Sequence, residues 1–214
     1  MSPGMPTGYI PTHREWEEIA QVVRDADLWL LYDAAMEKIL YDGRTVIHPA
    51  SFPDMRERTI TVGAASKELR MIGWRVGWVV APQEIMESIG LVSISNVVCQ
   101  TGISMAGAAA GLTASDNGLK EAVAVWEERR NTLLKELNGL PVIPPHGGWS
   151  MLIDAKQLGM NAKQLADTLF QQAKIAATPM TGWGEQAAQY VRFVFSSEPK
   201  ERLIGIGERI KKFL

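Results

Sequence analysis

Cysteine, long apolar runs and an excess of either charge are all scarce in this chain of 214 residues. Its single cysteine, Cys99, excludes an internal disulfide framework. The longest apolar runs, such as "LWLL" and "WVVAP", are far shorter than the ~20 residues that a membrane helix needs. No cationic segment followed by an apolar one stands near Met1, as a secretory signal would require. These absences predict a cytoplasmic protein.

The charge balance narrows the class of partner. A formal net charge of -2 and a pI near 6.0 leave no basic surface for nucleic acid or for an anionic membrane. The three histidines, His13, His48 and His146, are far apart and show no metal-ligand spacing. A small molecule is therefore the expected partner, and no metal site is predicted.

The first half of the chain alternates helices and strands. Thr12 followed by Glu15 is typical of a capping box, which predicts a helix over about 13–25. The run "LWLLYD" (28–33) is continuously apolar and ends in an acid, as in a strand that is buried on both faces of a parallel sheet. Segments 58–63 and 74–80 repeat that pattern. We therefore expect an α/β fold with a mostly parallel sheet.

The second half has a different organisation. Residues 84–113 are rich in Ala, Gly and Ser and are expected to be helical, and "ASDNG" then breaks the helix. A long amphipathic helix, further strands including "YVRFVF" (190–195) and a terminal helix should form a compact α+β unit. The predicted boundary divides the chain into residues 1–116 and 117–214. The long helix should bury Leu119, Val123, Trp126, Leu133 and Leu137, and the terminal helix should bury Leu203, Ile206 and Ile210.

The stretch "AASKELRMIGWRVG" (64–77) places Lys67 past the end of one predicted strand and Arg75 at the start of the next. A lone lysine is most often a solvated surface residue. At a strand end behind small residues, however, a partly desolvated amine can form a Schiff base. Arg75 offers a planar fork that suits a phosphate. Pyridoxal 5'-phosphate needs both groups, because its aldehyde bonds an amine and its phosphate anchors the other end.

Four segments in order resemble motifs of the class I/II aminotransferases, which are fold-type I pyridoxal-phosphate enzymes. They are "SPGMPTG" (2–8), "YDAAMEKILYDG" (32–43), "SKELRMIGWRVGWVVAP" (66–82) and "YVRFVF" (190–195). The resemblance implies that Lys67 carries the cofactor and acts as the base, with Ser66 beside it. It further implies that Arg75 holds the phosphate, that Asp33 pairs with the pyridine nitrogen, and that Arg192 binds the substrate carboxylate.

Two of these assignments have structural alternatives. Asp33 could equally be a helix N-cap or a turn acid, which is common after strands. Arg192 stands in an otherwise apolar strand, where Tyr190, Arg192 and Val194 share one face. An arginine in that position needs an anion, which is either a carboxylate of the protein or that of a substrate.

The chain departs from the family pattern at two cofactor contacts. Met5 stands where the family usually has an asparagine, and Met36 where it has a tyrosine; both of those residues bond the ring hydroxyl. A thioether is only a weak acceptor and replaces neither bond. Tyr32 cannot stand in for the tyrosine, because it points to the opposite face of its strand from Asp33.

Family members are about twice as long as this chain. The chain resembles the carboxyl-terminal portion, namely part of the large cofactor-binding domain (1–116) and a smaller α+β domain (117–214). A glycine-rich phosphate loop and a ring-stacking aromatic would precede it. The leading hypothesis is a pyridoxal-phosphate aminotransferase that moves an amino group from an amino acid to a 2-oxo acid, and that is a homodimer in full-length form. Alternatives are β-elimination or decarboxylation on the same cofactor, or a non-catalytic fragment.

Overall fold

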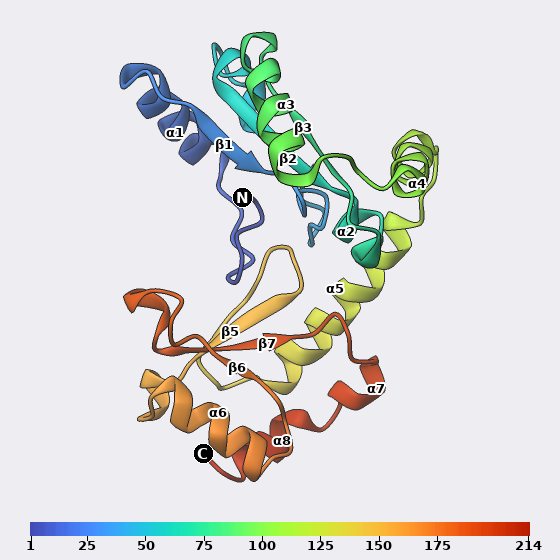
Figure 1. Cartoon of the computed structure of the whole chain (residues 1–214). Coiled ribbons are helices and arrows are strands. Elements are labelled where there is room, and N and C mark those ends of the chain that lie inside the picture. The colour runs from blue at the N-terminus through green and yellow to red at the C-terminus, as the bar shows by residue number, and fades with distance from the viewer. The chain divides into compact units, whose positions relative to one another are not determined.

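The computed structural model describes residues 1–214, which divide into two compact units. The first unit comprises Met1–Pro3 and Ile10–Leu119, and the second comprises Gly4–Tyr9 and Lys120–Leu214. The short segment Gly4–Tyr9 joins the second unit through backbone hydrogen bonds such as His146 N to Gly8 O, at 3.0 Å. Figure 1 labels the elements of both units. No helix has both the length and the apolar character that crossing a bilayer demands.

The first unit contains a three-stranded sheet in the order β1 (Leu30–Asp33), β2 (Thr59–Ala64) and β3 (Gly77–Val80). All three strands lie within or close to the predicted ranges. β1 and β2 are parallel, but β3 is antiparallel to β2, so the expectation of a repeated parallel pattern is wrong for the third strand. The short connection between β2 and β3 explains why β3 runs antiparallel. It holds only the one-turn helix α2 (Ala65–Glu68) and a 3-10 turn, whereas a parallel crossover usually contains a full helix.

The predicted amino-terminal helix is confirmed as α1 (His13–Asp25), and the capping box between Thr12 and Glu15 is present. Its buried face carries Trp16, whose ring meets that of Tyr32 edge-on at a centroid distance of 5.8 Å. Tyr32 is 1% exposed, but Leu31 on the other face of β1 is 66% exposed. The prediction that this strand is buried on both faces is therefore wrong: α1 covers one face, and nothing in the first unit covers Leu31.

Residues 84–113 are helical as predicted, but they form two helices, α3 (Gln83–Val97) and α4 (Gly102–Thr113). The break follows Val98, which has a positive φ of 65°. α3 has no buried residue, whereas α4 contributes Ala108 to a small core with Ala65 of α2. Gly63 is needed on β2, because a Cβ there would lie 2.2 Å from the indole nitrogen of Trp78 on β3.

The second unit is built on a four-stranded antiparallel sheet in the order β4-β5-β7-β6. All five residues of its central strand β5 are buried. On β7 the predicted alternation is confirmed, since Val191 and Phe193, together with Phe195 directly after the strand, are at most 5% exposed. The elements are α5 (Leu119–Glu136), β4 (Val142–Ile143), β5 (Ser150–Asp154), α6 (Ala162–Gln171), β6 (Thr178–Pro179), β7 (Tyr190–Val194), α7 (Lys200–Leu203) and α8 (Ile206–Lys211).

The helices of the second unit largely follow the sequence pattern. Leu133 and Leu137 are 1% exposed, as predicted for the long helix, whereas Leu119, Val123 and Trp126 are only partly buried. The terminal helix is interrupted at Gly205, which has a left-handed backbone conformation, and so becomes α7 and α8. Its predicted inward residues, Leu203, Ile206 and Ile210, are all buried.

Candidate active site

The parallel pairing of β1 and β2 fixes the position of the two groups at the centre of the site. Asp33, the last residue of β1, is paired in register with Val62 of β2. β2 ends two residues later at Ala64, and Lys67 lies in α2, which follows directly. Because the carboxyl ends of parallel strands meet at one edge of a sheet, Asp33 and the Lys67 turn lie at the same edge. Lys67 is partly buried there.

Ser66 and Arg75 converge within the same turn region. Arg75 caps a 3-10 turn with a left-handed backbone, φ 51° and ψ 51°. Its Nη1 donates a 2.8 Å hydrogen bond to the carbonyl oxygen of Ile72 and lies 3.4 Å from Oγ of Ser66. The guanidinium is thus held in place by its own turn while it remains exposed. A hydroxyl and a guanidinium this close together form a pair of donors suited to a phosphate.

Asp33 is a turn acid, which was one of the two interpretations left open by the sequence. Its Oδ1 accepts a 2.9 Å hydrogen bond from the backbone N–H of Ala35. That bond fixes the carboxyl group at the end of β1 and leaves Oδ2 without a partner in the chain. The structural interpretation therefore does not compete with the functional one, because the second oxygen stays available to a cationic N–H of a ligand.

Glu68 connects the two turns, and it is not among the site residues that the sequence predicts. Its Oε1 accepts a 2.8 Å hydrogen bond from the backbone N–H of Lys38, in the turn that follows Asp33. Since Glu68 is the next residue after Lys67, this bond links the segment of the lysine to that of the aspartate. Burial raises the pKa of the Glu68 carboxyl above its ordinary value, and the hydrogen bond and the charge of Lys38 oppose that shift. The two partners are 30 residues apart, so no local motif signals the contact.

Behind Asp33, on the opposite face of β1, lie three titratable groups. The ring of Tyr32 meets that of His48 edge-on at 4.9 Å, and Nε2 of His48 lies 4.0 Å from Oε2 of Glu37. Burial raises the pKa of Tyr32 and of Glu37, and it lowers that of His48. All three shifts favour the uncharged forms. Tyr32 therefore belongs to this cluster and lies away from the face of Asp33, as the strand alternation predicts.

The two methionines lie in different units. Met36, in the turn after β1, is 1% exposed in the first unit, and Met5 is partly buried in the Gly4–Tyr9 segment of the second. Neither side chain carries a hydrogen-bond donor. The first unit therefore contains Asp33, Ser66, Lys67 and Arg75 at one sheet edge. Met5 and Arg192 belong to the second unit.

Arg192 of β7 has no carboxylate partner in the chain. Its Nε is buried without a hydrogen-bond partner, and its guanidinium carbon lies 5.3 Å from the ring centroid of Trp183. A cation–π contact of this kind orients the guanidinium but does not neutralise it. The ion pair to an Asp or Glu of the protein, which the sequence left open, is thus absent. The guanidinium remains available to an external anion.

Comparison with known proteins places these residues in a family. A family model described as "Aminotransferase class I and II" matches residues 1–205. The chain belongs to this family. Family members use pyridoxal 5'-phosphate, which agrees with the resemblance carried by the four motifs.

Individual relatives cover the whole chain. The aromatic-amino-acid aminotransferase 2 of Thermococcus litoralis and an aspartate aminotransferase of Pyrococcus abyssi are each 32% identical over 217 aligned residues, which cover 100% of this chain and 56% of theirs. The crystal structure of an aromatic aminotransferase from Pyrococcus horikoshii OT3 superposes with a TM-score of 0.92 at 31% identity, over 99% of this chain and 57% of that one. The chain thus spans a little over half the length of these relatives.

Proposed function

We propose that this chain forms the lysine-bearing portion of a pyridoxal-phosphate aminotransferase that moves an amino group from an amino acid to a 2-oxo acid. The observation that carries the proposal is the grouping of Lys67, Ser66 and Arg75 in one turn region, at the sheet edge where Asp33 ends β1. An amine, a hydroxyl beside a guanidinium, and a carboxyl with one unpaired oxygen are the donor and acceptor set that this cofactor requires.

Each side chain has a separate task in this proposal. Lys67 would hold the cofactor through its amine and would move a proton at the substrate Cα as the general base. Arg75 and Ser66 bind the phosphate. Asp33, ionised, keeps the pyridine nitrogen protonated. When bound, the cofactor supplies a sink for the electron pair that the departing Cα proton leaves behind.

Arg192 is proposed to bind the substrate carboxylate. The support is its lack of any carboxylate partner, together with the contact to Trp183 that orients the guanidinium. A planar guanidinium binds a carboxylate through two parallel hydrogen bonds, so it fixes the direction of the substrate as well as its position. The substrate's side-chain preference is not part of the proposal, since the named relatives include enzymes for aromatic amino acids and for aspartate.

The family assignment supports a further proposal on organisation. We infer that residues 1–116 belong to a large cofactor-binding domain and residues 117–214 to a smaller domain, with the Gly4–Tyr9 segment packed on the latter. A homodimeric, cytoplasmic protein is the expected context. Met5 and Met36 have no donor for the cofactor's ring hydroxyl, which keeps β-elimination and decarboxylation as the alternative reactions.

The test is an analysis of products from several amino acids on protein loaded with pyridoxal 5'-phosphate. Transamination predicts release of the matching 2-oxo acid and transfer of ¹⁵N from a labelled amino acid to 2-oxoglutarate or pyruvate. Lys67→Ala should remove both signals. Release of free ammonia with an unsaturated product would identify elimination, and release of CO₂ would identify decarboxylation; either result would replace the proposed reaction.

A further inference from the structure

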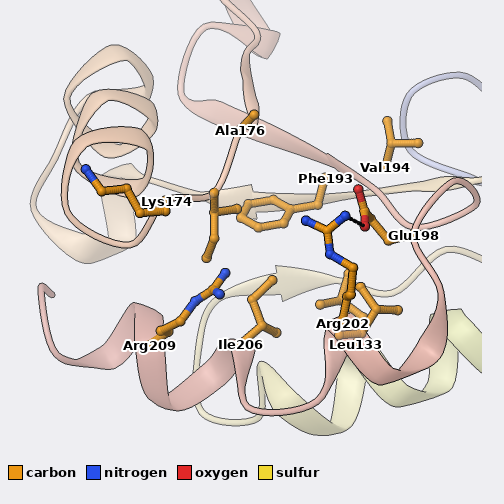
Figure 2. A pocket seen from close by; sticks show the side chains of 11 residues that line it. Leu133, Lys174, Ala176, Phe193, Val194, Glu198, Arg202, Ile206 and Arg209 are labelled. Atoms are coloured by element: carbon orange, nitrogen blue, oxygen red, sulfur yellow. Dashed lines mark ion pairs between the residues drawn. The ribbon is translucent and has the colours of Figure 1, made fainter.

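A pocket of about 260 Å³ lies in the second unit. None of the residues proposed to bind cofactor or substrate lines it, although Phe193 and Val194 in its wall follow Arg192 on β7. Its lining side chains come from the segment after α6, from strand β7, from the loop between β7 and α7, and from helices α5, α7 and α8 (Figure 2). Its volume is slightly below the range of about 300–1,000 Å³ that is usual for ligand pockets. The pocket is therefore suited to a small molecule.

The floor of the pocket is apolar. Phe193 of β7, Leu203 of α7 and Ile206 of α8 contribute to it, and they are 5%, 3% and 8% exposed. Phe193 lines the pocket together with Ile206 and Arg209 of α8, and the alternation of side chains along β7 puts Arg192 on the opposite face of the strand. A molecule on this floor would consequently not occupy the position proposed for the substrate carboxylate.

The rim is cationic. Lys174, Arg202 and Arg209 surround the pocket, and Glu198 is the single carboxylate among its lining residues. Nη1 of Arg202 lies 2.9 Å from Oε2 of Glu198, and Nζ of Lys174 donates to the carbonyl oxygen of Gln171 at 2.7 Å. Arg209 makes no ion pair, and Figure 2 shows its guanidinium turned toward the pocket. Two positive charges thus remain uncompensated at the rim, in a chain whose net charge is -2.

An apolar floor below a cationic rim specifies the ligand class. The floor excludes strongly hydrated ions as good ligands, and the rim repels cations. The Lys174 ammonium is held at the carbonyl oxygen of Gln171, so an anion in the pocket is stabilised mainly by the guanidiniums of Arg209 and Arg202. We propose that this pocket binds a small organic carboxylate with an aryl or branched aliphatic body, whose carboxylate meets Arg209 and Arg202 while the body rests on Phe193 and Ile206.

The ion pair between Glu198 and Arg202 predicts that loss of Glu198 improves ligand binding. This residue competes with the ligand for Arg202, so its removal should strengthen binding, whereas removal of Arg209 should weaken it. Opposite effects from two neighbouring substitutions separate a binding role from a general disturbance of the fold. Arg209 is exposed and the Glu198 side chain is 41% exposed, although the Glu198 Oε2 that faces Arg202 is itself buried; neither residue belongs to the apolar core.

The experiment is a titration of the ¹⁵N-labelled chain with phenylacetate, followed through the backbone amide signals. Saturable shifts are expected at residues 174–176, 193–194 and 202–209. Arg209→Gln should raise the Kd about fivefold, the effect of losing about 1 kcal/mol. Glu198→Gln should lower the Kd by a comparable factor. Arg209→Lys should retain most of the affinity, since it keeps the charge.

Four controls decide the outcome. Lys156→Gln removes an exposed charge of the second unit outside the pocket, and Arg192→Gln removes the proposed substrate anchor; neither should change the Kd at the pocket residues. Phenethylamine, which carries a positive ammonium in place of the carboxylate, and inorganic phosphate, which has no apolar body, should both bind much more weakly. Equal binding of phenethylamine, loss of the shifts in Arg192→Gln, or weaker binding in Glu198→Gln would each overturn the proposal. Amide signal shifts that do not saturate with phenylacetate in the unmodified chain would also overturn the proposal.

Discussion

The two units differ in how completely they bury their own apolar surface. In the second unit, Met151, Leu152 and Ile153 on the central strand are at most 3% exposed. In the first unit, Leu31 and Val80 on the sheet are 66% and 62% exposed, and helix α3 buries no residue. Yet the first unit holds most of the proposed cofactor residues. Their geometry depends on local hydrogen bonds at strand ends, whereas unit stability depends on apolar burial, so the two properties can be separated.

The largest effect should come from the core of the second unit. Ile153→Ala removes a side chain that is 1% exposed and should lower the free energy of unfolding by about 2–5 kcal/mol. Val80→Ala truncates an exposed side chain of the first unit and should change stability by no more than about 0.5 kcal/mol. Urea denaturation followed by circular dichroism measures both. Comparable losses would show that the burial contrast does not govern stability.

The next effect concerns the phosphate donors of the first unit. Arg75→Gln removes a charged donor while Ser66 remains, and it should weaken the binding of pyridoxal 5'-phosphate by about 1.5–3 kcal/mol, or roughly ten- to a hundredfold. Absorbance titration with the cofactor provides the Kd. Arg56→Gln, which removes another exposed charge of the same unit, is the matched control and should leave the Kd unchanged. An equal loss in both variants would indicate a general charge effect.

The contact between the two turns should have a smaller effect. Glu68→Ala removes the acceptor for the N–H of Lys38 and should destabilise the first unit by about 0.5–1.5 kcal/mol, whereas Glu68→Gln keeps an acceptor oxygen. If the bond positions Lys67 relative to Asp33, the alanine variant should also bind the cofactor more weakly, and the glutamine variant should bind normally. Unchanged cofactor binding in Glu68→Ala would limit this residue to a structural role.

The smallest effect is a pH dependence of the first unit. Because burial raises the pKa of Glu37 above its ordinary 4.5, the folded protein holds this proton to a higher pH than the unfolded chain does. Stability should therefore fall as pH rises from about 4.5 through the raised pKa, and then level off. Glu37→Gln should flatten this part of the curve. Glu68 acts in the same direction, whereas His48, whose pKa is lowered, makes stability rise as pH increases from that lowered pKa toward the ordinary 6.5, above which the gain levels off.

Urea midpoints measured between pH 4 and pH 8 would detect the change. A steeper fall in Glu37→Gln than in the unmodified chain would contradict the assigned sign.

Local patterns in the sequence were enough to locate most elements. The Thr12–Glu15 capping box, the alternation on β7 and the inward face of the terminal helix follow from spacing alone, and each is confirmed. The direction of β3 could not be predicted, because it depends on whether the chain crosses over or turns back after α2. The hydrogen bond between Glu68 and Lys38 could not be predicted either, because it joins segments 30 residues apart.

The sequence predicted the solvent exposure of side chains less well than it predicted the positions of helices and strands. The run "LWLLYD" has the composition of a strand covered on two faces, but composition does not say whether a covering element is present in the same unit. Leu31 is an example, because it belongs to this apolar run and is nevertheless 66% exposed. Arg192 shows the converse: the sequence left open an anion from the protein or from a substrate, and only the structure shows that its Nε has no hydrogen-bond partner in the chain.

Covalent labelling shows directly whether Lys67 is the residue that bears the cofactor. The protein is mixed with pyridoxal 5'-phosphate, reduced with borohydride, digested and mapped by mass spectrometry. We expect a stoichiometric adduct on the peptide that contains Lys67, and no such adduct in a Lys67→Ala variant whose circular dichroism is unchanged. Labelling spread over exposed lysines such as Lys120 and Lys163, with no preference for Lys67, would contradict it.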